Sequence, residues 1–296
     1  MSTFIAFVIN GLSLGCVYAL IAIGFVVVFK STRVLNFAHG SVLLLGAYVV
    51  GRTHEALGFG PAVLAGVGAA AVAGVVVEVV IMRRARRADL GTLAILTLGV
   101  DIVMLTELTR RIGVDVLTTG APWGTEVVDL AGAKVPQSRL IAAAVAVVLV
   151  IALAAAFKYS DAGVAMRAAA ADDETASLMG IRLGRVAMAA WALAGALAAV
   201  AGVFLGSFPS PGIDATLGLA ALAAIPAWVL GGFDSIPGAV VGGLVIGVVS
   251  ALTTGYQDEL SFLGRGLGEV APYAVMLLVL LIRPSGLFGT REITRV

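Results

Sequence analysis

The strongest constraint on this chain is a series of long apolar segments that alternate with short stretches holding most of the charged residues. An α-helix of about 20 apolar residues spans the hydrocarbon core of a bilayer. We expect nine such elements, at Ile9–Phe29, Phe37–Gly51, Pro61–Met82, Thr92–Leu108, Leu140–Phe157, Val186–Phe208, Leu217–Leu230, Pro237–Leu252 and Val270–Ile282. The pattern predicts an all-α, polytopic membrane helix bundle, with residues 1–296 forming one transmembrane domain.

Composition supports this fold class. Hydrophobic residues make up 60% of the chain and charged residues only 12%, whereas soluble domains carry about 25% charged residues. Three elements are short: the second, the seventh, which contains Pro226, and the last, which contains Pro272. Short or proline-interrupted segments are typical of broken helices that line a cavity or lie buried in protein. We therefore expect eight or nine transmembrane elements, some of them broken.

The cationic residues predict an orientation. One side of the predicted bundle holds 13 of the 19 Lys and Arg residues, around Lys30, residues 83–87, residues 158–185 and the tail from Arg283. Cytoplasmic loops carry the excess of Lys and Arg. Nine alternating spans then place the N-terminus outside and the C-terminus in the cytoplasm, as in a multi-pass protein of a bacterial inner membrane. Residues 1–29 contain no Lys or Arg, so we expect no cleaved signal peptide.

Motifs of catalysis and cofactor binding are missing from the sequence. It contains no phosphate-binding G-x-x-x-x-G-K-[ST] loop, no H-E-x-x-H and no G-x-S-x-G. Cys16 is the single cysteine, and His39 and His54 are predicted at opposite membrane faces. We therefore expect no catalytic residue, no metal site and no cofactor bound by this chain. A net charge of +1 gives no basic surface for nucleic acid.

Small residues and one carboxylate stand out within the spans. Gly238 and Gly242, and likewise Gly243 and Gly247, have the four-residue spacing that lets helices pack closely in lipid. Asp101 lies near the middle of the fourth span, where an ionised carboxylate is costly and needs a partner or a cavity. It either lines the transport path or is satisfied within the bundle, by Thr97 or Thr106. Asn36 and His39 are expected at an inner junction, where they hold the short second helix or take part in gating.

The loop over residues 158–185 is predicted to contain two short helices. Ala165–Ala171 is a strong helix former. Asp172 is a suitable N-cap for a second helix, and Gly180 is a suitable residue to end it. This loop is either a solvated connection or a docking surface for another protein.

Several ordered motifs resemble one family. They are Asn10-Gly11 with Val17–Gly24, then Asn36–Gly40, then Gly163-x-x-x-Arg167-Ala168 with Asp172, Ala176, Leu178, Gly180 and Ile181, then Leu230–Ala239, and finally Arg283–Gly289. Together they resemble the branched-chain amino-acid (leucine/isoleucine/valine) permeases of bacterial ABC importers, over nearly the whole chain.

The resemblance implies a set of partners in the membrane. These are a second permease subunit (homologous, or a copy of this chain), two cytoplasmic ATPase subunits that use the ATP, and an extracytoplasmic solute-binding protein. It also implies that residues 158–185 form a coupling loop, with Gly163, Arg167, Ala168, Asp172, Ala176 and Gly180 as the residues that couple it to the ATPases.

Two positions depart from the family pattern. Leu105-Thr106 replaces a frequent Gln-Asn pair, and Ala171 replaces a frequent Glu. The first departure leaves urea or short-chain amides as alternative substrates to branched-chain amino acids. The residues themselves also leave open an ion-coupled secondary transporter that uses Asp101, a passive channel and an intramembrane enzyme, although no catalytic cluster for an enzyme is found.

Overall fold

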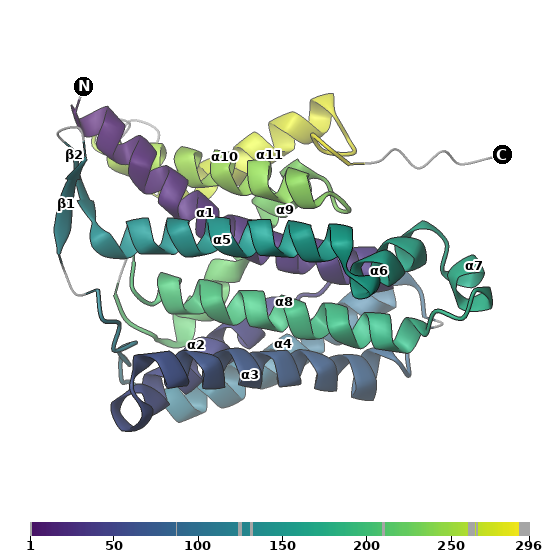
Figure 1. Cartoon of the computed structure of the whole chain (residues 1–296). Helices are drawn as coiled ribbons and strands as arrows, with labels where there is room; N and C mark the ends of the chain where they lie inside the picture. The colour runs from purple at the N-terminus through teal and green to yellow at the C-terminus, as the bar shows by residue number, and fades with distance from the viewer. Residues whose placement is uncertain are drawn as a thin grey trace.

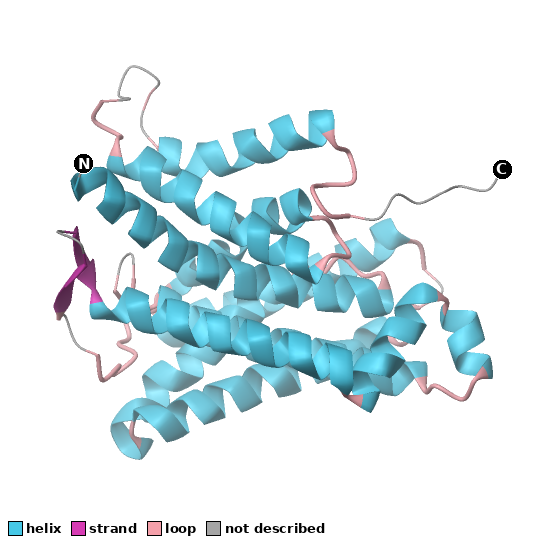
Figure 2. Ribbon diagram, turned by 45° about the horizontal axis from the view of Figure 1, so that its top comes forward, coloured by secondary structure: helices cyan, strands magenta, loops and turns pink. Residues whose placement is uncertain are grey.

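The computed structural model describes residues 2–86, 88–123, 126–130, 133–208, 211–259, 264 and 266–289. Most of this part of the chain is helical (Figures 1 and 2). The helices are α1 Ser2–Thr32, α2 His39–Leu57, α3 Phe59–Val77, the π-helix η1 Glu78–Met82, α4 Leu90–Ile112, α5 Gln137–Tyr159, α6 Asp161–Ala171, α7 Asp173–Leu178, α8 Leu183–Leu205, the 3₁₀-helix η2 Ala215–Ala224, α9 Ile225–Gly231, α10 Ile236–Gly255 and α11 Leu267–Ile282. Strands β1 (Val127–Leu130) and β2 (Ala133–Pro136) form an antiparallel hairpin.

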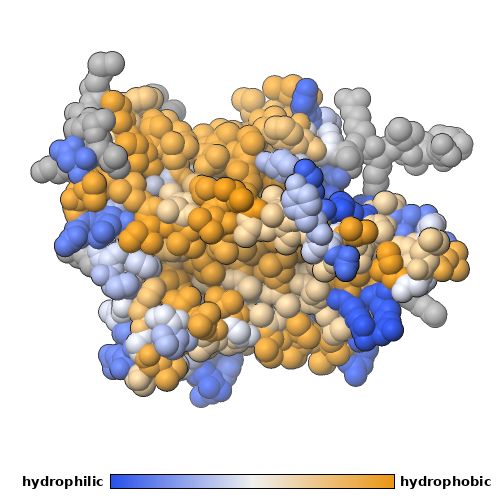
Figure 3. Space-filling model, viewed as in Figure 1, coloured by the Kyte–Doolittle hydropathy of each residue, from blue (hydrophilic) through white to orange (hydrophobic). Residues whose placement is uncertain are grey.

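The predicted all-α membrane bundle is confirmed. Six helices in the described part are long and apolar enough to cross a membrane: α1, α3 with η1, α4, α5, α8 and α10. The paired elements η2 and α9, and also α11, are shorter apolar helices. Figure 3 shows an apolar band over the middle of the visible face, with hydrophilic residues gathered toward its two ends. This distribution matches a bilayer core between two polar surfaces.

The two ends of the bundle are fixed by α5, which begins directly after β2 and ends directly before α6. We call them the hairpin end and the α6–α7 end (Figure 1). The ring of Phe7, near the start of α1, lies 5.3 Å from that of Tyr256, just past α10. At the other end of α1, Lys30 Nζ donates to the Asp234 carbonyl at 3.3 Å. Helices α1 and α10 therefore lie antiparallel along the bundle, as the predicted alternation requires.

Helices α1 and α8 form the centre of the bundle, and most of their residues are buried. Few residues of α4 and α5 are buried, and these helices lie on the outside of the bundle. A side chain added at Gly243 would meet the backbone nitrogen of Ala19 on α1 at 2.6 Å, and one at Gly247 would overlap Gly15. The other pair, Gly238 and Gly242, meets the backbone of α9 in the same way. Thus one glycine pair of α10 allows close packing against α1, and the other pair allows close packing against α9.

Of the predicted short elements, the second is an unbroken helix and the seventh changes geometry inside the bundle. Helix α2 begins at His39 after a non-helical stretch. The seventh element changes from 3₁₀ to α geometry at Ile225, and Pro226 stands in the first turn of α9, where its missing N–H costs nothing. The start of α2 packs on η2, because a Cβ on Gly40 would lie 2.5 Å from the Gly218 carbonyl oxygen.

Candidate functional site

The loop predicted as a docking surface folds as two helices, α6 and α7, at one end of the bundle (Figure 1). Ser160 caps α6 by accepting a hydrogen bond from the Gly163 backbone N–H at 3.0 Å. Gly163 is buried, and an added Cβ would lie 2.6 Å from the carbonyl oxygen of Ala156 on α5. This glycine therefore lets α6 fold back tightly against the end of α5.

Helix α7 has the predicted start and end. The Asp172 carboxylate accepts hydrogen bonds from the backbone N–H of Thr175 at 3.0 Å and from its hydroxyl at 2.6 Å. These bonds favour the charged form and hold the pKa of Asp172 below its usual range. Gly180 follows the helix with φ of 87°, in the left-handed region that favours glycine. Ala168, also predicted, accepts a hydrogen bond from the Asp172 backbone N–H at 3.1 Å. The prediction of two short helices is confirmed.

The loop has an inner and an outer face. Of the residues carried over from the family, Gly163 and Ala176 face the bundle and are buried, whereas Arg167 and Gly180 are exposed. Leu178, which is part of the family motif but was not among the predicted coupling residues, and Met179, which was not predicted, are 83% and 80% exposed. Their signal in the sequence is an apolar pair between the acidic first turn of α7 and the left-handed glycine. The exposed tip of α7 is thus apolar, beside the acidic first turn of the same helix.

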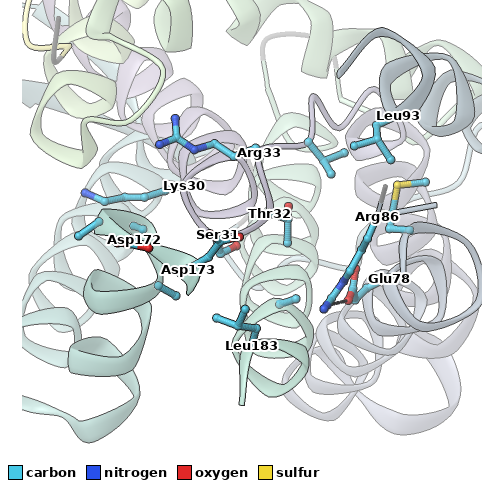
Figure 4. A pocket seen from close by; sticks show the side chains of 16 residues that line it. Lys30, Ser31, Thr32, Arg33, Glu78, Arg86, Leu93, Asp172, Asp173 and Leu183 are labelled. Carbon is cyan, nitrogen blue, oxygen red and sulfur yellow. Dashed lines mark hydrogen bonds and ion pairs between the residues drawn. The ribbon is translucent and has the colours of Figure 1, made fainter. Parts of the chain in front are cut away.

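A cavity of about 340 Å³ separates part of this loop from the bundle. Figure 4 shows Asp172 and Asp173 on one side of the cavity and Glu78 and Arg86 on the other, with the end of α1 between them. Glu78 lies in the π-helix, is 1% exposed and pairs with Arg86 at 2.8 Å. The α6–α7 pair therefore has free space on its inner side, next to a buried carboxylate that is paired with a partly exposed arginine.

A second group of predicted residues meets where α2 begins. Asp101 accepts a hydrogen bond from the backbone N–H of Ser41, in the first turn of α2, at 3.1 Å. Four residues earlier on α4, Thr97 accepts one from the backbone N–H of Phe37 at 3.1 Å. Backbone donors at a helix start have no partner within the helix, and a carboxylate there is also favoured by the helix dipole. The hydrogen-bond partner of Asp101 is therefore the start of α2, whereas Thr97 bonds elsewhere at the same junction; whether Asp101 also lines the transport path stays a prediction.

His39 and Asn36 lie deeper than predicted. We expected them at a membrane face, but both are buried, at 1% and 4% exposure. The His39 ring packs on Phe25, with centroids 4.6 Å apart, and against Gly24, both well inside α1. The position differs because α2 begins within the bundle and not at its surface. His39 Nε2 and Asn36 Oδ1 are buried and have no hydrogen-bond partner among the described residues.

Comparison with known proteins identifies the family. The family model described as "Branched-chain amino acid transport system / permease component" matches residues 7–282. The chain belongs to this permease family. It is 35% identical to the high-affinity branched-chain amino acid transport system permease protein LivH of Escherichia coli K12, over 97% of this chain and 96% of that protein. The corresponding protein BraD of Pseudomonas aeruginosa is 31% identical, over 97% of this chain and 96% of its own length.

A relative outside the bacteria is also similar: the probable branched-chain amino acid transport permease protein LivH of Methanocaldococcus jannaschii is 30% identical over 91% of this chain. No solved structure matches the chain. As a member of this permease family, the protein is a multi-pass transport subunit of the inner membrane, and its relatives are transport permeases and not enzymes. In the described part, no three His, Cys, Asp or Glu residues are grouped closely enough to hold a metal.

Proposed function

We propose that this permease is the membrane-spanning subunit of an ABC importer for branched-chain or other hydrophobic amino acids. In this proposal the chain binds no nucleotide, and two separate cytoplasmic ATPase subunits dock on α6 and α7. The proposal rests on one observation: the apolar side chains of Leu178 and Met179 are exposed at the end of α7, a helix whose start is capped. We call this pair the apolar tip. Exposed apolar patches with polar surroundings are typical of protein interfaces.

Coupling then follows from the contacts of the loop. Closure of the ATPase dimer would push on α7, whose start is fixed by Asp172 and whose end is fixed by Gly180. Gly163 joins α6 tightly to α5, so the push passes to the bundle. The cavity beside Glu78 gives the loop room to move. Nucleotide biases the inward- and outward-open packings only through its different affinity for the two states.

The proposed assembly also needs an orientation and further partners. With the excess of Lys and Arg in the cytoplasm, the α6–α7 end is cytoplasmic, the N-terminus lies outside and the C-terminus lies inside. The exposed apolar faces of α4 and α5 would meet lipid and a second permease subunit. A solute-binding protein would deliver substrate at the hairpin end.

The relatives are named for branched-chain amino acids, and this supports the proposed substrate. Leu105, where a polar residue is frequent in the family, lies beside η2: a Cβ on Gly218 would be 3.4 Å from its Cδ1 atom. Because this position departs from the family pattern, urea or a short amide remains the alternative substrate.

The docking role is tested by the double substitution Leu178→Glu and Met179→Glu, co-expressed with the two ATPases. Both side chains point into solvent in the free chain, so folding should be unaffected. We expect co-purified ATPase to fall at least about tenfold, as for hot-spot residues. The control is Val114→Glu, a fully exposed residue at the hairpin end, which should retain ATPase. Equal ATPase recovery with the double variant and the control would contradict docking at α7.

A further inference from the structure

A cavity of about 540 Å³ lies at the hairpin end, opposite the proposed ATPase site. Its walls come from the segment after α4, the start of α5, the end of α8 and the segment that follows α8. Helices α5 and α8 place this cavity at the far end of the bundle, because α5 runs toward α6 and α8 runs away from α7. The volume falls within the range of small-molecule sites.

In this cavity, one guanidinium nitrogen has no hydrogen-bond partner in the described part of the chain. The Nε atom of Arg139, in the first turn of α5, is buried and has no hydrogen-bond partner in the described part of the chain. Its guanidinium carbon lies 5.4 Å from the centroid of the Phe208 ring, so the aromatic face holds it in place. By contrast, Arg110 and Arg111 at the same end are paired with Glu107, at 2.8 Å and 2.6 Å.

The residues beside the cavity that lie outside the described part include no acidic partner, and the nearby Glu126 is exposed. Residues 124–125, 131–132 and 209–210, which lie outside the described part, are Gly, Thr, Ala, Gly, Pro and Ser. A buried cationic donor without a partner needs an explanation. A ligand carboxylate is the group that a guanidinium binds best, through two parallel hydrogen bonds.

The other residues that line the cavity indicate which chemical groups the rest of the ligand carries. Trp123 stacks on Phe204, with centroids 5.5 Å apart, and meets the ring of Phe59 edge-on at 5.1 Å. Its indole Nε1 is buried and has no partner among the described residues. Thr119 and Ser207, with hydroxyl oxygens 3.4 Å apart, add the polar atoms of the wall. One cation, a few hydroxyls and an aromatic surface suit a carboxylate joined to an apolar side chain and a small polar group.

We propose that this cavity receives an apolar amino acid at the outer face and holds its carboxylate on Arg139. The proposal rests on the proposed function, because it names a substrate site of the same importer. Trp123 forms part of the site and Arg139 determines its specificity for carboxylates.

Tryptophan fluorescence gives a direct test. The chain has three tryptophans, and Trp191 and Trp228 are only 1% and 4% exposed in the interior. The assembled permease complex in lipid nanodiscs, without binding protein, is titrated with leucine, 4-methylpentanoate and isoamylamine. The part of the fluorescence change that is absent from the Trp123→Phe complex is assigned to Trp123 in the cavity. We expect saturable changes with the two carboxylates and none with the amine.

The variants show whether Arg139 carries the interaction. Arg139→Gln should weaken leucine binding at least about tenfold, since hydrogen bonds to charged groups are strong. Arg139→Lys should keep part of the binding, because the charge remains but the planar fork is lost. Arg110→Gln, a 70% exposed side chain at the same end, should bind like the unaltered complex.

Three binding results, and one comparison of binding with uptake, would overturn the inference. One is equal binding of isoamylamine and leucine, and another is unchanged leucine binding in both Arg139 variants. The third is a loss of binding-protein association in Arg139→Gln with leucine binding intact, which would make Arg139 a docking residue. The titration measures binding and not uptake. ATP-driven leucine uptake without a Trp123 signal would therefore reject this site while the proposed function stands.

Discussion

Gly180 ends α7 in a backbone conformation that other residues avoid, with φ of 87°. No atom lies within 4 Å of a Cβ added there, so substitution changes the backbone strain and nothing else. A non-glycine residue in this region costs about 1–2 kcal/mol, and asparagine tolerates it best. Gly180 therefore allows a test of the loop geometry without a steric clash.

Replacing Gly180 by valine should shift the end of α7 and uncouple ATP hydrolysis from uptake, because the apolar tip would no longer meet the ATPase in register. Gly180→Asn should keep most of the coupling. Uptake per ATP hydrolysed in the reconstituted complex is the measurement. Arg167→Ala is expected to lower the same ratio while membrane insertion stays normal. Coupling that is as good with valine as with asparagine would show that the end of α7 is unimportant.

Asp101 is a second residue whose role the contacts define. Because its carboxylate accepts the Ser41 backbone N–H, Asp101→Leu should destabilise the start of α2 by about 1 kcal/mol, the usual cost of a lost cap. Asp101→Asn keeps an acceptor and should stay close to the original stability and uptake rate. Detergent-induced unfolding and uptake assays measure the two effects. A large loss of uptake in Asp101→Asn at normal stability would instead place this carboxylate on the transport path.

At the scale of elements, the hydropathy pattern predicted where several helices end along the chain. It did not predict how deeply the start of α2 lies inside the bundle. The third and last elements end where predicted, at Met82 and Ile282, because hydropathy and the following charges define those ends. The π-helix after Val77 was not foreseen. The depth of His39 was also missed, since it depends on how far α2 reaches into the bundle, which packing against α1 and η2 determines.

The candidate site was predicted to a similar degree. Asp172 and Gly180 were found because capping and left-handed turns have local sequence signatures. The bond between Asp101 and Ser41 joins residues 60 apart in the chain, and no local pattern predicts such a pair. Arg139 was counted only as an outer charge, because its missing partner becomes visible only when the cavity is seen.

The packing of α10 on α1 supplies a test at this scale. Gly247→Leu would force a side chain into the backbone of Gly15 and should destabilise the bundle by about 1–3 kcal/mol or more. Gly68→Leu on α3 is the matched control, because no atom lies within 4 Å of its added Cβ. The fraction of folded protein recovered from the membrane measures the effect. Equal recovery of the two variants would contradict close α1–α10 packing.

The whole molecule has a cavity at each end of the bundle and a tightly packed centre between them. The α6–α7 end has an exposed apolar tip and a cavity on its inner side, and the hairpin end holds a cavity with a buried guanidinium nitrogen that has no partner in the described part. Between the two ends, the start of α2 packs closely on η2, with Gly40 against Gly218. This arrangement suits a subunit that passes a small solute and receives its energy from other proteins.

The measurement that tests this account most directly is leucine uptake into proteoliposomes that contain this chain, a second permease subunit and both ATPases, with binding protein outside and ATP inside. We predict uptake that requires ATP and the ATPases, and no ATP hydrolysis by the purified chain alone. Uptake by this chain without ATPases, driven by a proton or sodium gradient or flowing passively downhill, would contradict the account.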